Sequence, residues 1–446
     1  MRDIVGTRFG TMLGLGVASI FLAVTPGWLQ GEALSLREAI EQSLERNEEI
    51  QAAREAVRQR EGRVREVRSG AFPSLTADFS YTRNIKLPVI FFETEEGVQQ
   101  ITIGEENAYS LSFGLEQTID LFGRVPKALD VAHLYAGIGE ENLVQVESEV
   151  VYSVKRFYYG AVLAEELSAV AGKSLEQAEA SLSQIESMVR EGTKSRFDLL
   201  RARVEVANRK PELIRAQNQA ELSKSRLRRI IGLPLDEEIR LTDKLLMEPL
   251  EIGLDEGIQL ALSRRPELRS VRMDEEMGEV QLGLAGLERY PEFFFSSNYS
   301  FQGQTEEAFP EDREIARSWA AGVGFRFPLF DGMRTSGKVD QARAQLSMAR
   351  YRKVQAEEEV RLEVLEAFRD LEAAEEEIRS QQANVEEAEE AYRLATIRFT
   401  SGLSTQLEVN DVELALNLAR TNFYQSLFNY NTAKARVEKA IGEEVR

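Results

Sequence analysis

Residues 74–83, SLTADFSYTR, alternate strictly between apolar and polar side chains. The apolar side of this alternation consists of Leu75, Ala77, Phe79 and Tyr81. The same period recurs in YSLSFGLEQTIDL (109–121), EFFFSSNYSF (292–301) and WAAGVGFRFPL (319–329), although Phe294 breaks it. Because successive side chains of a strand point to opposite faces, this period predicts strands with one apolar and one polar face. We therefore predict four strands, at about 72–83, 109–121, 292–301 and 319–329.

These strands have the features of membrane-crossing segments. About ten residues is the length that a tilted strand needs to cross a bilayer. Large aromatic residues gather toward the loop-facing ends, where a membrane barrel carries an interfacial aromatic girdle: Tyr81, Tyr109, Tyr299, Phe301 and Trp319. The alternative is a soluble sandwich that buries the same apolar faces in a core. We favour contact with membrane lipid, because every one of these strands carries large aromatic residues, which a secreted chain would expose.

Four strands cannot cross a membrane alone, because lipid offers no hydrogen-bond partner to the open edges of the sheet. Several chains must therefore close one barrel. Two chains would give eight strands, whose interior side chains roughly fill, whereas three would give twelve strands and an open lumen. The strands alone favour an oligomer without fixing its size.

The chain contains an internal duplication. Leu36, Pro73 and Tyr81 recur 218 residues later, and the glycines 192 and 232 recur 210 residues later. We therefore divide the sequence into a first repeat (34–232), a linker (233–253) and a second repeat (254–446). Each repeat orders its elements alike, with two short helices, two strands and a long helical hairpin that turns at Gly192 or Gly402.

The two helical hairpins are predicted to be much longer than the helices of a compact domain. The long helices are predicted at about 125–190 and 335–400, and at ~1.5 Å per residue each extends roughly 100 Å. Apolar residues recur on the second one at spacings of three and four, which is typical of coiled-coil packing. The fold class is therefore an α+β membrane protein, in which strands alternate along the sequence with coiled-coil helices.

Composition excludes several functions. The chain has no cysteine and one histidine, His133, which removes thiolate and multi-histidine metal sites and histidine-based triads. A net charge of −20 argues against nucleic-acid binding. No nucleophile–base set emerges, so we expect neither enzyme activity nor a cofactor. Residues 1–33 have the basic start, short apolar run and small-residue cleavage site of a signal peptide.

Together these features resemble the TolC-like outer-membrane efflux protein family. The resemblance covers nearly all of the mature chain and includes LSLREAIEQSLERNEEIQAAREA (34–56), LDEGIQLALSRRPELRSV (254–271), FPSLTADFSYTRN (72–84) and FRFPLFDGMR (325–334). It extends through both turns, REGTKSRFDLLRAR (190–203) and FTSGLSTQLEVNDVE (399–413). The Asn-Pro step common in the family is Asn47-Glu48 in the first repeat and Arg265-Pro266 in the second.

The resemblance implies a homotrimer in the outer membrane of a Gram-negative-type cell, with a twelve-stranded β-barrel continued by an α-helical barrel across the periplasm. A periplasmic adaptor protein and an inner-membrane transporter would dock and open this passive exit duct, in an efflux or type I secretion system. Loops 83–108 and 302–318 would face the cell exterior. Two other readings stay open: a periplasmic coiled-coil adaptor or scaffold without a pore, and a passive porin-like pore.

The resemblance also assigns roles at the periplasmic end. It points to adaptor contacts at the two tips, through Arg190, Gly192, Thr193, Ser195, Gly402, Leu403 and Ser404. Glu408 and Asp411 stand three residues apart and share a helix face, where the family has a constricting acidic ring. Asp198 and Phe399 fall at positions resembling those that hold the aperture closed. On the residues alone, an acidic pair at this spacing is usually a solvated surface.

Overall fold

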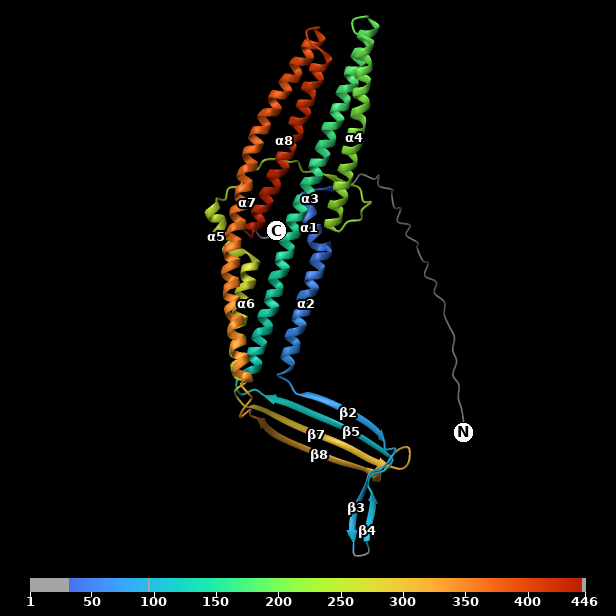
Figure 1. Cartoon of the computed structure of the whole chain (residues 1–446), viewed down its shortest axis with the longest axis vertical. Coiled ribbons are helices and arrows are strands. Elements are labelled where there is room, and N and C mark those ends of the chain that lie inside the picture. Colours follow the sequence, from blue (N-terminus) through green and yellow to red (C-terminus); the bar gives the residue numbers. More distant parts are fainter. Residues whose placement is uncertain (1–31, 95–96, 443–446) are drawn as a thin grey trace, which may run out of the picture.

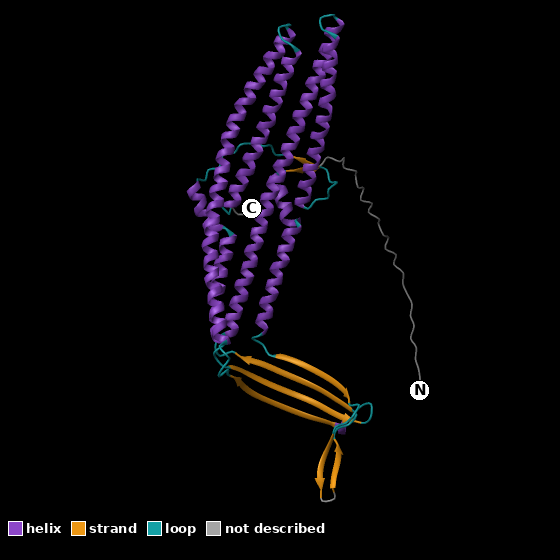
Figure 2. Cartoon of the chain, in the orientation of Figure 1, coloured by secondary structure: helices purple, strands orange, loops and turns teal. Residues whose placement is uncertain are grey.

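A long helical part and a separate β-sheet make up the chain, and the sheet lies at one end of the helices (Figures 1 and 2). The structure is a computed structural model, and it describes residues 32–94 and 97–442. Residues 1–31 of the predicted signal peptide lie outside the described residues.

Both repeats fold into the same series of four helices. The first repeat contains α1 (Leu36–Arg46), α2 (Glu48–Ser69), α3 (Arg124–Arg190) and α4 (Arg196–Ile231). The second contains α5 (Leu254–Arg264), α6 (Pro266–Leu287), α7 (Arg334–Thr400) and α8 (Gln406–Ala440). The long helices α3 and α7 have 67 residues each, so each is about 100 Å long. Within the described residues, none of the helices combines the length and the apolar composition that crossing a membrane requires.

The short and return helices pack in succession along the long ones. In the first repeat α2 and then α4 lie along α3, and in the second α6 and then α8 lie along α7 (Figure 1). Contacts of α3 with both α6 and α8 join the repeats into one bundle. The apolar stripe of α7 faces this packing, with Val364, Leu371 and Ile378 all buried.

Local sequence signals fix the helix starts. Ser35 begins α1 with a capping box, in which its hydroxyl accepts from the Glu38 backbone and the Glu38 carboxylate accepts from Ser35. The Asn47 side chain caps α2 and also donates to the carbonyl of Ile230 at 2.9 Å. At the matching step of the second repeat, Pro266 occupies the first turn of α6, where a missing N–H costs nothing.

The main core lies at mid-length of the helices, where the linker wraps around them. Tyr158 of α3 is fully buried, and its hydroxyl donates to the carbonyl of Leu34 at 2.9 Å. The same hydroxyl accepts from the backbone N–H groups of Thr242 and Asp243. Residues 233–253 are therefore tied to the bundle rather than forming a free connection.

Part of this linker forms a strand pair that the sequence did not predict. Strand β6 (Ile239–Leu241) pairs in parallel with β1 (Glu32–Leu34). Two residues assigned to the signal peptide, Glu32 and Ala33, thus belong to β1. The end of the signal peptide stays a prediction, and β1 itself could not be predicted, because a strand of three residues carries no readable alternation.

The sheet contains four antiparallel strands in the order β2-β5-β7-β8. They are β2 (Ser74–Arg83), β5 (Asn107–Ile119), β7 (Glu292–Thr305) and β8 (Ile315–Arg326). Strand β8 ends before Pro328, since proline has no N–H to donate to a ladder, so the predicted end at 329 is too late. Strands β7 and β8 both extend further into the predicted loop 302–318 than expected. The connection between them is therefore only residues 306–314, and it includes the 3₁₀ turn η1 (Asp312–Glu314).

The predicted loop 83–108 holds a second, smaller sheet. Strands β3 (Val89–Thr94) and β4 (Gly97–Thr102) pair as an antiparallel hairpin. This hairpin extends from the far end of the main sheet, away from the helices (Figure 1).

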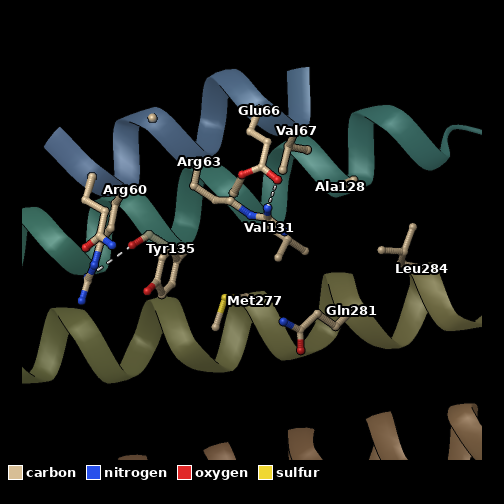
Figure 3. Close-up of a pocket in the computed structure, with 13 residues that line it drawn as sticks. Arg60, Arg63, Glu66, Val67, Ala128, Val131, Tyr135, Met277, Gln281 and Leu284 are labelled. Carbon is tan, nitrogen blue, oxygen red and sulfur yellow. Dashed lines mark hydrogen bonds and ion pairs between the residues drawn. The ribbon is translucent and has the colours of Figure 1, made fainter. Parts of the chain in front are cut away.

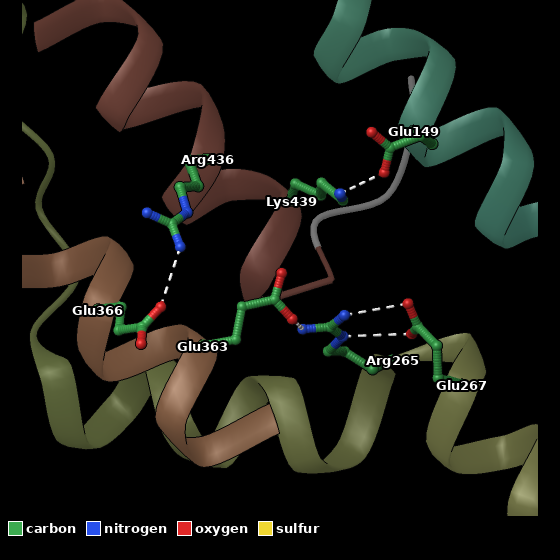
Figure 4. A network of polar contacts seen from close by, with 7 residues as sticks. All are labelled: Glu149, Arg265, Glu267, Glu363, Glu366, Arg436 and Lys439. Carbon is green, nitrogen blue, oxygen red and sulfur yellow. Dashed lines mark hydrogen bonds and ion pairs between the residues drawn. The ribbon is translucent and has the colours of Figure 1, made fainter. Parts of the chain in front are cut away.

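Ion pairs join α5 and α6 to the long helices (Figure 4). Arg265, which is 6% exposed, forms ion pairs with Glu267 at 3.0 Å and with Glu363 of α7. Nearby, Arg436 of α8 pairs with Glu366 at 3.1 Å. The helices of the second repeat are thus held together at mid-length by charge pairs as well as by apolar packing.

Candidate functional site

The strand register separates the main sheet into an apolar face and a polar face. One cross-strand row runs through Ala77, Phe113, Tyr299 and Trp319. The next row, on the opposite face, runs through Asp78, Ser112, Ser300 and Ser318, and the last two hydroxyls lie 2.8 Å apart. The apolar face has no cover within the described chain, where Trp319 is 71% exposed and Val323 79%.

All five predicted girdle residues lie on the apolar face, toward the end of the sheet that is far from the helices. The rings of Tyr81 and Tyr109 are 4.9 Å apart, as are those of Tyr299 and Phe301. Trp319 Nε1 donates to Ser297 Oγ at 3.0 Å. Rings with an apolar body and a satisfied polar group suit a membrane–water interface.

Both hairpin turns are built alike. Gly192 and Gly402 have φ values of +79° and +75°, a left-handed conformation that glycine adopts without a steric penalty. The next backbone N–H groups, of Thr193 and Leu403, donate to the carbonyls of Met188 and Arg398 at 2.9 and 2.8 Å. These are Schellman motifs, which satisfy the last carbonyls of α3 and α7.

The predicted adaptor-contact residues all lie in these two turns. Their side chains are partly engaged locally, since Arg190 donates to Ser187 Oγ and Thr193 Oγ1 donates to the carbonyl of Met188. Two apolar side chains at the tips are exposed to solvent: Leu403 is 72% exposed and Phe197 of α4 is 71% exposed. Each tip thus offers an apolar residue beside polar backbone turns.

The predicted acidic pair begins α8. Glu408 lies in the first turn, and its carboxylate accepts from Ser404 Oγ at 2.6 Å. Asp411 is exposed, and in the described part of the chain its carboxylate has no hydrogen-bond or ion-pair partner. Of the two carboxylates, Asp411 is therefore the one free to interact with another chain or with a cation.

Asp198 and Phe399 have local roles that the sequence reasoning missed. Asp198 completes a capping box at the start of α4, where its carboxylate accepts from Ser195 Oγ at 2.7 Å. This hydrogen bond lowers the pKa of Asp198. The pattern Ser-x-x-Asp after Gly192 was the signal available for it.

Phe399 is 4% exposed and packs in a small core near the tips. This core draws one or two side chains from each of α3, α4, α7 and α8: Ile185, Ala202, Ala395, Phe399 and Val409. The ammonium of Lys194, in the turn of the first hairpin, lies 4.6 Å from the centre of the Phe399 ring. A cation over an aromatic face is favourable, so this contact joins the two hairpins at their tips.

Glu413 of α8 was not singled out from the sequence. It lies two residues beyond Asp411, is 6% exposed, and faces Ser174 of α3 and Arg209 of α4. Burial raises the pKa of its carboxyl, and Arg209 partly opposes that rise. A carboxylate that follows two others at the start of α8 gives no sequence signal of its burial, because the side chains that face it, on α3 and α4, are more than 200 residues away.

A groove of about 800 Å³ lies in the part of the bundle nearer the sheet, between α2, α3 and α6 (Figure 3). Its lining includes the apolar residues Ala128, Val131 and Leu284. Arg60 crosses it, with its guanidinium carbon 4.7 Å from the centre of the Tyr135 ring. The groove is separate from the tips and from the acidic pair.

Comparisons with known proteins agree with this architecture. The family model described as outer membrane efflux protein matches residues 39–233 and 257–443. Nodulation protein T of Rhizobium leguminosarum bv. trifolii is 22% identical over 94% of this chain and 88% of its own. The toluene efflux pump outer membrane protein TtgC of Pseudomonas putida is 22% identical over 94% of this chain and 85% of its own.

Solved structures share the fold. The Campylobacter jejuni CmeC outer membrane channel superposes with a TM-score of 0.76 at 16% identity, covering 91% of this chain and 85% of its own. The outer membrane protein VceC of Vibrio cholerae gives a TM-score of 0.74 at 18% identity, covering 92% and 97%. The two segments that the family model matches, residues 39–233 and 257–443, correspond to the two repeats, and the linker lies between them.

Proposed function

Because the chain belongs to the outer membrane efflux protein family and is an outer-membrane efflux channel that extends into the periplasm, we propose that three copies assemble into one duct. Each copy would supply its four strands to a twelve-stranded barrel. The observation that carries this proposal is a sheet with one uncovered apolar face and two edges, β2 and β8, that have no partner in the described chain. Lipid cannot satisfy such edges, whereas β8 of one copy can pair with β2 of the next.

Members of this family work with periplasmic adaptors and inner-membrane pumps, and the family is one of channels rather than of enzymes. The adaptor reading of this chain, a coiled-coil protein without a pore, is therefore set aside. For this chain we place adaptor docking at the two tips. The open side chains of Leu403 and Phe197 support that placement, because exposed apolar residues beside satisfied backbone turns suit a protein partner.

The aperture is assigned to the acidic pair. Three copies would bring six carboxylates around one axis, where their mutual repulsion and attraction for cations control passage. We expect the two carboxylates to contribute unequally, because Glu408 accepts a hydrogen bond from Ser404 whereas Asp411 has no partner in the described part of the chain. The Lys194–Phe399 contact would keep the hairpins together in the closed duct.

The test of assembly is the mass of the detergent-solubilised protein. We expect about three times the mass of the mature chain, and release from outer membranes only when detergent is added. A monomer that dissolves in plain buffer would overturn the proposal.

The test of the aperture is conductance in planar bilayers. We expect Asp411→Ala to raise single-channel conductance more than Glu408→Ala, because the free carboxylate contributes more field in the opening. Asp340→Ala, on the exposed part of α7 near the sheet, is the matched control and should leave conductance unchanged. Equal conductance in the wild type and in Asp411→Ala would remove this residue from the aperture.

A further inference from the structure

A buried polar seam joins the two hairpins below their tips. Asn417 of α8 donates through Nδ2 to Ser174 Oγ of α3 at 3.2 Å, and Gln406 of α8 donates to Ser181 Oγ of α3 at 3.0 Å. Glu413 lies between these two contacts along α8, and its carboxyl also interacts with Ser174. The hairpins thus meet through polar groups where apolar packing is the usual solution.

This seam has more unpaired acceptors than unpaired donors, and the buried donors without a hydrogen-bond partner near it in the described part of the chain are Arg209 Nε and Arg420 Nη1. Buried oxygens of four side chains have no hydrogen-bond partner in the described part of the chain: Gln177 Oε1, Gln406 Oε1, Glu413 Oε1 and Asn417 Oδ1. An unpaired buried acceptor costs about 1–3 kcal/mol. Among these groups only the carboxyl of Glu413 can gain a donor, by binding a proton.

The charges around Glu413 also disfavour its ionised form. Arg209 is the cation of α4 that faces it, but the guanidinium already forms ion pairs with Glu205 at 2.8 Å and Glu212 at 3.2 Å. An ionised Glu413 would be the third carboxylate to share the single positive charge of the Arg209 guanidinium.

The remaining charged and titratable groups around Glu413 leave it no other cation. Tyr392 of α7 faces the same cluster and carries no positive charge. Arg420 of α8 also faces Tyr392, and it is paired with Glu389 at 2.8 Å.

We propose that Glu413 is a proton-binding site that locks α8 against α3, with its carboxyl protonated while the hairpins are packed and ionised when they part. This rests on the proposed function, in which the tips separate to open the duct. Separation would expose the carboxyl to water, where it loses the proton. The packed state therefore takes up one proton per chain.

The sign of the pH dependence follows from this uptake. Burial raises the pKa of Glu413 in the packed state, so the lock is complete below the pKa of the separated state and is lost as pH rises through the packed-state pKa. Between these two pKa values, each pH unit changes the equilibrium constant between the packed and the separated hairpins by up to about 10-fold per chain. Three chains moving together would multiply this to about 1,000-fold per unit.

The experiment measures the distance between the tips directly. Cysteines at Glu191 and Ser401, the matching C-cap residues that follow the two long helices, carry spin labels, and the natural chain has no cysteine to interfere. In the full-length protein we expect the wild type to shift from short to long distances as the pH rises, with a midpoint above the usual pKa of a glutamate. Glu413→Gln should keep the short distance throughout, because the amide cannot ionise.

Two further variants sharpen the outcome. Glu205→Gln frees part of the Arg209 charge for Glu413, so the midpoint should move to lower pH. Glu387→Gln, on the exposed face of α7, should leave the midpoint at the wild-type value. A Glu413→Gln protein that still responds to pH like the wild type would overturn the proposal.

Two controls distinguish this failure from failure of the duct mechanism. If added adaptor parts the tips at constant pH while Glu413→Gln and wild type respond alike to pH, the duct opens but Glu413 is not its lock. If neither adaptor nor pH parts the tips, the opening mechanism itself fails. In that case an infrared band of a protonated carboxyl that persists at pH values above the ordinary glutamate pKa of about 4.3, and that is lost in Glu413→Gln, would still support the proton site, and its absence from the wild type would overturn it.

Discussion

The ring of Phe294 lies over Gly324, its cross-strand partner on the polar face of the sheet. A Cβ atom at Gly324 would stand 2.6 Å from the ring carbon Cζ, which is closer than such atoms approach. Phe294 is the residue that breaks the alternation of its strand, and the absent side chain on β8 gives its ring the room it needs. The glycine and the phenylalanine therefore form one packing unit.

Gly324→Val should destabilise the sheet, because the new side chain must displace the Phe294 ring. Overpacking of this kind costs typically about 1–3 kcal/mol per site. Gly322→Val, on the same face and the same strand, is the control, since nothing lies within 4 Å of its Cβ position. The unfolding temperature of the detergent-solubilised protein should fall for the first variant only. Equal effects at both glycines would show that Phe294 does not depend on Gly324.

Arg265→Met should destabilise the helical part. The substitution leaves Glu267 and Glu363 partly buried without their cation, and breaking a buried pair costs about 3–5 kcal/mol. Arg436→Met removes two ion pairs, with Glu366 and Asp370, that are more exposed, and it should cost less than about 1 kcal/mol per pair. Thermal unfolding of both variants tests this order, and a larger loss for Arg436→Met would contradict it.

The same ion pair predicts a loss of stability in acid. Although burial opposes it, the hydrogen bond from Arg265 holds the pKa of Glu267 below its usual value. A carboxyl of this kind contributes stability above its unfolded pKa, about 4.3, and loses it as pH falls through the lower folded pKa. The difference in unfolding temperature between wild type and Arg265→Met should therefore shrink below about pH 4. A constant difference from pH 7 to 3 would argue against an electrostatic origin.

Gly402→Ala should strain the second hairpin turn. Nothing lies within 4 Å of its Cβ position, so the cost comes from the left-handed backbone alone, about 1–2 kcal/mol. Gly62→Ala in α2 has equally open surroundings and an ordinary helical backbone, and it should stabilise by up to about 1 kcal/mol. The rate of proteolysis at the tips should rise for Gly402→Ala and stay unchanged for Gly62→Ala.

Long, periodic elements could be predicted from the sequence, and short ones could not. The predicted helices at 125–190 and 335–400 lie within one residue of α3 and α7. In contrast, the sequence predicts a loop where β3 lies, because Ile90, Phe91 and Phe92 are consecutive apolar residues without alternation. Strand pairing between segments more than 200 residues apart, as in β1 and β6, leaves no local pattern at all.

Site residues, too, could be predicted only where a local sequence pattern indicates them. The glycines of the two turns could be predicted from their spacing in the sequence, because the reversal between two helices needs a residue in the left-handed conformation. The burial of Glu413 and the contact of Lys194 with Phe399 depend on how two hairpins from different repeats pack. Such contacts follow from tertiary structure, so neither residue could be identified from its neighbours in the chain.

Trp319 provides a direct test of which sheet face meets lipid. Of the two tryptophans, Trp28 lies in the predicted signal peptide, and Trp28→Phe leaves Trp319, on the apolar face of β8, as the one tryptophan wherever cleavage occurs. Brominated lipids quench a tryptophan that touches them, and we expect strong quenching of Trp319 in reconstituted vesicles. The matched control removes Trp319 and places a tryptophan on the polar face by Ala320→Trp, opposite Asn298. Its emission should resist brominated lipid and respond instead to a water-soluble quencher. Quenching by lipid at both positions would contradict a sheet whose polar face lines an aqueous lumen, and quenching at neither would remove the sheet from the membrane.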